Sequence, residues 1–71
     1  MAWTHKATVG ELQVSVDAAN GWAEIVGEGK EWRGCATIFG VVYIYGRTFG
    51  VDPFALFGEE KMAAVHEAIN V

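Results

Sequence analysis

The chain has 71 residues, of which 52% are hydrophobic and 20% are charged, and its formal net charge is −4. This length predicts one small domain spanning residues 1–71, with enough apolar residues to form a core. The acidic balance disfavours binding to nucleic acid or to an anionic membrane through a basic patch, so we expect neither partner.

A domain this small usually gains stability from a disulfide, a bound metal or association with another chain. Cys35 is the only cysteine, so no internal disulfide can form, and association is the expected supplement. A single cysteine also suits a reducing compartment, and residues 1–6 lack the apolar core of a signal peptide. We therefore expect a cytoplasmic protein.

The N-terminal part of the chain predicts antiparallel strands. Residues 1–10 fit either a first strand or an ordered lead-in to the sheet. Apolar and polar side chains alternate through residues 11–17, which predicts a strand with one buried face. Residues 17–21 end in Asn-Gly, a pair suited to the positive φ angles of a hairpin turn. Residues 22–26 then predict the returning strand, because aromatic and β-branched residues favour a pleated surface.

A second hairpin turn is predicted at residues 27–30, which are polar and rich in glycine. Residues 31–38 alternate again, with Trp32 and Ala36 on one face and Arg33 and Cys35 on the other. These segments together predict a three-stranded antiparallel meander.

Residues 39–45 are open to three interpretations. Their β-branched and aromatic residues favour a fourth strand buried on both faces. A helix is the alternative, but Gly34, Gly40 and Gly46 flank or interrupt it and weaken it. A membrane span fails on length, because only the 13 residues 34–46 separate two arginines, against the roughly 20 that a spanning helix needs. We prefer the strand.

The C-terminal part predicts an amphipathic helix. Asp52-Pro53 has the N-cap and first-turn residues of a helix start. Gly58 followed by two glutamates indicates a break and a restart of the helix. The apolar residues fall on one stripe: Phe54, Phe57, Met62, Val65 and Ile69. The predicted fold class is therefore α+β, an antiparallel three- to four-stranded meander sheet packed on one face by a C-terminal α-helix.

No group of residues predicts a catalytic or metal site. Cys35 as a nucleophile needs a nearby base, and His5 and His66 lie at opposite ends of the chain. The three residues also lack the short spacings typical of zinc ligands, so a surface role is expected for His66. We expect no cofactor, no metal and no enzymatic activity.

The large aromatic residues are numerous for so short a chain. They can fill the core, or some of them can form an interaction surface, since interfaces favour Trp, Tyr and Arg as anchors. The residues predicted to bind a partner are Trp32, Arg33, Tyr43, Tyr45 and Arg47.

The resulting functional prediction is a small acidic, non-enzymatic protein-binding module. It would act as an inhibitor or adaptor by occupying a surface of another protein. The alternative is a self-associating structural subunit, a homodimer or higher oligomer, that uses its sheet and aromatic surface.

Overall fold

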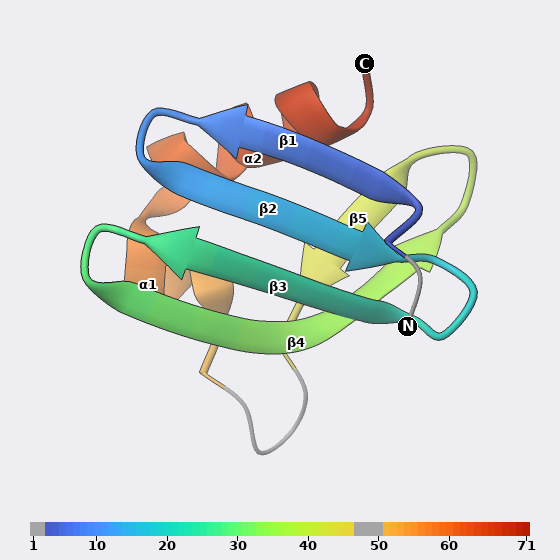
Figure 1. The fold of residues 1–71 in the computed structure, drawn as a ribbon, viewed down its shortest axis with the longest axis horizontal. Coiled ribbons are helices and arrows are strands. Elements are labelled where there is room, and N and C mark those ends of the chain that lie inside the picture. The colour runs from blue at the N-terminus through green and yellow to red at the C-terminus, as the bar shows by residue number, and fades with distance from the viewer. Residues whose placement is uncertain (1–2, 47–50) are drawn as a thin grey trace.

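The computed structural model describes residues 3–46 and 51–71, which form a curled five-stranded antiparallel sheet followed by two helices (Figure 1). The strands are adjacent in chain order: β1 (His5–Val9), β2 (Leu12–Asp17), β3 (Trp22–Gly27), β4 (Lys30–Ile38) and β5 (Val42–Tyr45). Helices α1 (Pro53–Phe57) and α2 (Glu59–Ile69) lie behind β1–β4 in the view of Figure 1. Neither described helix is long and apolar enough to cross a membrane.

The predicted α+β class is confirmed, but the sheet has five strands and not three or four. The additional strand is β1, which occupies the segment that the sequence left open between a strand and a lead-in. Its alternation is weak because Ala7 is small and His5 is polar, yet both lie on the half-buried side of the strand. Pairing with β2 along all five residues supplies the order that the local pattern does not.

Both predicted hairpin turns are confirmed. The buried Asp17 carboxylate accepts hydrogen bonds from the Asn20 amide N–H (3.3 Å) and from Asn20 Nδ2 (2.8 Å), and Gly21 follows at a φ of 72°. In the second turn, Glu28 and Gly29 have φ angles of 54° and 72°. Two consecutive positive φ angles are typical of a two-residue turn whose twist matches the flanking strands. This turn sets the register of β3 against β4.

The strand preferred for residues 39–45 is confirmed only for its second half. β4 ends at Ile38 and β5 begins at Val42, so residues 39–41 form the connecting turn. Gly40 has a φ of 81°, a conformation that interrupts a strand and that glycine adopts without steric cost.

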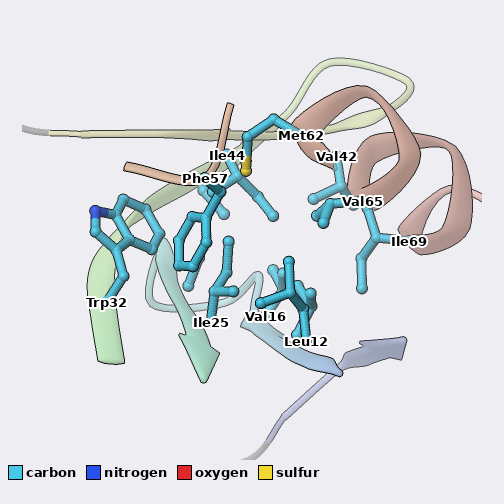
Figure 2. Packing of buried hydrophobic residues seen from close by; sticks show 13 residues of the cluster. Leu12, Val16, Ile25, Trp32, Val42, Ile44, Phe57, Met62, Val65 and Ile69 are labelled. Atoms are coloured by element: carbon cyan, nitrogen blue, oxygen red, sulfur yellow. The ribbon is translucent and has the colours of Figure 1, made fainter. Parts of the chain in front are cut away.

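One core holds the sheet and the helices together (Figure 2). Inward-facing side chains of β2–β5 contact the apolar side of the helices. The core residues from the sheet are Leu12, Val14, Val16, Ala23, Ile25, Trp32, Ala36, Val42 and Ile44, and those from the helices are Phe57, Met62, Val65 and Ile69. The predicted helical stripe is therefore buried, except that Phe54 is only partly buried.

The predicted start and break of the helical segment are also confirmed. The Asp52 side chain accepts a hydrogen bond from the Phe54 amide at 3.0 Å, and Pro53 occupies the first turn. Gly58, at a φ of 94°, separates α1 from α2. Both helices contribute buried residues to the same core, Phe57 from α1 and Met62, Val65 and Ile69 from α2.

Two side chains, His66 of α2 and its C-cap residue Asn70, form hydrogen bonds with the outer edge of β5. The Val42 amide donates to Asn70 Oδ1 at 2.6 Å, and Asn70 Nδ2 donates to the Val42 carbonyl at 3.0 Å. The Ile44 amide donates to His66 Nε2 at 3.0 Å. We call these three bonds the edge cap, because they satisfy backbone groups of β5 that a further strand would otherwise bind.

His66 was expected to lie on the surface, and the structure corrects this. Its Nδ1 lies 2.8 Å from the Met62 carbonyl, which can only accept, so Nδ1 carries the proton. Nε2 is then free of hydrogen and accepts from the Ile44 amide. Both ring nitrogens of the half-buried imidazole are therefore used: Nδ1 bonds within α2, and Nε2 joins the helix to β5.

Asn70→Ala tests the edge cap. The substitution leaves the Val42 amide and carbonyl without their partners, and we expect a loss of about 1–3 kcal/mol in the free energy of unfolding. Urea denaturation measures that loss, and hydrogen exchange should show faster exchange of the Val42 amide. Glu67→Ala, an exposed change on the same helix, serves as the control. Equal stability and equal Val42 exchange in the two variants would show that the two Asn70 bonds of the edge cap contribute nothing.

Candidate functional site: an aromatic face outside the sheet

Three large rings lie on the outer face of the sheet, opposite the core. Trp22 of β3 is 46% exposed, and Tyr43 and Tyr45 of β5 are 48% and 39% exposed. Cys35 and Thr37 of β4 lie between the flanking strands. We call the surface formed by these five residues the aromatic face.

The strand register explains why these residues meet. Trp22 pairs with Cys35, and Cys35 pairs with Tyr45, so the three form one row across the sheet. Thr37 and Tyr43 form the next row. Directly opposite side chains in such rows lie about 4.5–5.5 Å apart at Cβ, so they contact each other. Cys35 is small and lies between two rings, and it is buried although it is on the outer face.

The two tyrosines belong to a series of stacked rings. The Tyr45 and Tyr43 centroids are 6.3 Å apart, Tyr43 and His66 are 5.1 Å apart, and His66 and Phe54 are 5.7 Å apart. Neighbouring planes differ by 18–26°. Because the edge cap fixes His66, Tyr43 rests on an oriented ring while nearly half of its surface stays exposed. Tyr43 therefore turns towards the helix and still remains accessible.

A charged pair and a hollow border the aromatic face. Arg33 Nε lies 3.2 Å from Glu24 Oε2 across β3 and β4, in the row next to Trp22. Beside this pair is a hollow of about 200 Å³ lined by Trp3, Trp22, Ala23, Glu24 and Arg33. The lining combines two indole rings with one ion pair, which suits an apolar side chain better than a charged one.

The opposite border is apolar. The end of β4 and the turn that follows it expose Ile38, Phe39 and Val41, and Phe39 is 85% exposed. We call these three residues the apolar tip. The tip follows directly on the row of Thr37 and Tyr43, so it continues the aromatic face to the end of the hairpin.

The structure brings together three of the five residues predicted to bind a partner. Arg33, Tyr43 and Tyr45 lie exposed on the outer face. Arg47 lies outside the described residues. Trp32 is in the core at 4% exposure, so it does not belong to the surface. It pairs with Ile25 on the inner face, and its Nε1–H donates to the Val51 carbonyl at 2.9 Å.

Trp22 is the ring that sequence reasoning left out of the predicted set. The predicted turn at residues 27–30 contained the information needed to place Trp22 on the outer face. A turn that pairs Gly27 with Lys30 also pairs Trp22 with Cys35, and so places Trp22 on the face opposite Ala23 and Ile25. Composition alone does not distinguish Trp22 from Trp32.

The imidazole of His66, which lies beside the aromatic face, serves to hold the fold together. His66 uses both ring nitrogens in hydrogen bonds to backbone groups. In residues 3–46 and 51–71, no three His, Cys, Asp or Glu side chains are grouped so that they could hold a metal ion. What the aromatic face presents is ring surface, two tyrosine hydroxyls and the neighbouring Arg33, which together can bind apolar and hydrogen-bonding groups.

No protein-family model, curated protein sequence or solved structure matches this chain. A function for the aromatic face therefore has to be argued from its own chemistry and that of its borders.

Gly34→Ala tests why Trp32 is inside. A Cβ at residue 34 would overlap the six-membered ring of Trp32 and lie 2.9 Å from the Tyr45 carbonyl oxygen. Because overpacking of this kind costs about 1–3 kcal/mol, we expect Gly34→Ala to lower the free energy of unfolding by that amount. In a Trp32→Phe background the smaller ring should relieve part of the cost. Strictly additive effects of the two substitutions in urea denaturation would contradict this packing.

Proposed function

We propose that this protein is a non-enzymatic, acidic protein-binding module that occupies a surface of another protein through the aromatic face. The single observation that carries the proposal is the row of Trp22 and Tyr45 with Tyr43 beside it, three half-exposed rings on one rigid sheet surface. Such a module acts as an inhibitor or adaptor, because covering the partner's surface requires no chemical step.

The exposure of the rings supports binding over packing. The inner face already has a complete apolar core without them. Large rings left half in water are unfavourable, and a contiguous apolar patch on a small monomer marks an interaction surface. Buried tyrosine and tryptophan side chains are also the commonest energetic anchors of interfaces.

The ring stack supports binding through its effect on entropy. Tyr43 and Tyr45 stack on each other, and Tyr43 stacks on His66, which is held by two hydrogen bonds. Ordering a mobile side chain at an interface costs about 0.5–1.5 kcal/mol. Rings that are already oriented lose less conformational entropy on binding, so the entropic cost of forming the interface is lower.

The charge of the chain indicates the kind of partner. The net charge is −4, and the exposed Glu31 lies on the outer face towards the hairpin turn. Opposite charges attract a partner before contact and align it. The partner surface that fits is therefore apolar where it meets the rings and basic around them, with the apolar tip entering a groove beyond.

Affinity capture with point variants tests the proposal. The immobilised protein is incubated with extract, the captured protein is identified and purified, and its affinity is measured by calorimetry. We expect Trp22→Ala and Tyr45→Ala each to weaken binding by about 2 kcal/mol or more, as anchors of an interface do. Tyr43 is not a suitable first target, because its ring supports His66.

Val26→Ala is the matched control. Val26 is exposed and apolar and lies on the same outer face, but it pairs with Glu31 at the charged end of the sheet. We expect it to leave the affinity unchanged. Thermal unfolding of each variant confirms that the fold is retained. Binding that is equally strong for wild type, Trp22→Ala and Tyr45→Ala would show that the aromatic face is not the binding surface.

A further inference from the structure

The hollow that borders the aromatic face lies between the start of the chain and the middle of the sheet. It is lined by Trp3, which precedes β1, by Trp22, Ala23 and Glu24 of β3, and by Arg33 of β4. Its volume of about 200 Å³ is below the roughly 300–1,000 Å³ of pockets that enclose whole small-molecule ligands. The size of the hollow therefore suits one side chain.

Thr4 fixes the chain next to Trp3. The Thr4 amide and hydroxyl donate to the Val16 carbonyl at 2.8 Å and 3.1 Å, and the hydroxyl oxygen accepts from the Ala18 amide at 3.0 Å. Trp3 itself precedes the first paired residue of β1. The wall that Trp3 forms is thus held by the hydrogen bonds of its neighbour.

The charges around the hollow disfavour an ionic occupant. In one row across the outer face, Ser15 pairs with Lys6 on one side and with Glu24 on the other, and Glu24 pairs with Arg33. A cation would meet two positive side chains against one carboxylate. An anion would meet that carboxylate and indole rings, whose faces are negative. A neutral group fits this arrangement best.

The ion pair in the lining still has free hydrogen-bonding capacity. Arg33 Nε lies 3.2 Å from Glu24 Oε2, and among residues 3–46 and 51–71 neither Glu24 Oε1 nor the terminal nitrogens of Arg33 have a hydrogen-bond partner. The carboxylate can only accept and the guanidinium can only donate. A hydroxyl serves both, because it donates and accepts, whereas an indole N–H only donates and a hydrocarbon does neither.

We propose that the hollow binds one tyrosine side chain of the partner protein. The ring packs against Trp3 and Trp22, and the phenolic hydroxyl donates to Glu24 Oε1 and accepts from the Arg33 guanidinium. Tyrosine is also among the residues most enriched at the anchoring positions of interfaces. The inference rests on the proposed function in one respect, that the partner is a protein.

N-acetyltyrosinamide is the probe for the hollow, because it carries the tyrosine side chain and can be used before the partner is identified. In an NMR titration it should shift the indole N–H signals of Trp3 and Trp22. The N–H of Trp32, which is bonded to the Val51 carbonyl in the core, is the internal reference. N-acetylphenylalaninamide lacks only the hydroxyl and should bind at least tenfold more weakly, because the bond to a carboxylate is lost. Equal affinities for the two amides would overturn the proposal.

Glu24→Gln examines the hydroxyl contact from the side of the protein. Glutamine keeps the size of the side chain but replaces a charge-assisted hydrogen bond by a neutral one, which is about half as strong. We therefore expect the preference for the tyrosine amide over the phenylalanine amide to fall several-fold. An undiminished preference would mean that the hydroxyl does not contact Glu24.

Trp3→Ala removes one wall of the hollow. Because Trp3 lies outside the strands and helices, the fold tolerates the change, and we expect binding of N-acetyltyrosinamide to weaken about tenfold. Tyr45→Ala is the matched control, since it removes a ring of the aromatic face that does not line the hollow. It should leave binding of the amide unchanged. Equal affinities in the two variants would place the amide elsewhere.

The captured partner separates this inference from the proposed function. Trp3→Ala should weaken the complex about tenfold, and replacing the partner's contacting tyrosine by phenylalanine should weaken the wild-type complex but add little in Trp3→Ala. A complex weakened by Tyr45→Ala but not by Trp3→Ala would refute the tyrosine in the hollow and leave the aromatic face standing. A complex weakened by Trp3→Ala but not by Tyr45→Ala would support the hollow and count against the aromatic face.

Discussion

The structure depends most on the bonds between α2 and the backbone of β5. Apolar contact alone would hold the helix against the sheet without specifying where along the strand it sits, because the hydrophobic effect is non-directional. The hydrogen bonds from His66 and Asn70 have direction and length, so they set the position of α2 relative to β5. With that position set, Met62, Val65 and Ile69 fall over the inner face of the curled sheet. Lys61 adds a bond to Glu28 at 2.7 Å near the other end of the helix.

The contact between His66 and β5 also connects the core side of the sheet to the aromatic face. His66 is held by the Met62 carbonyl and the Ile44 amide, and its ring then supports Tyr43 on the outer side. The fold and the proposed binding surface thus share one residue. The edge cap acts at β5, and α2 also packs closely against β1 at the other margin of the sheet.

Trp22 and Trp32 show how one residue type takes two roles. Trp32 lies on the inner face over Gly34, whose missing side chain leaves room for the indole, and its Nε1–H is bonded to the Val51 carbonyl. Trp22 lies on the outer face beside Cys35. Side chains alternate between faces along a strand, so the register set by the turn at Glu28 and Gly29 sends one ring in and the other out.

The sequence by itself determined the α+β class, the hairpin turns at residues 17–21 and 27–30, the helix start at Asp52 and the break at Gly58, because each follows from local chemistry. Alternation, positive φ angles and capping involve residues close together in the chain. Only the tertiary structure decided the role of residues 5–9 as a strand, the burial of Trp32, the function of His66 and the composition of the aromatic face. Those features depend on pairs such as Ile44 with His66 and Trp22 with Cys35, which are distant in the chain. No local pattern encodes which backbone group a side chain 22 residues away will meet.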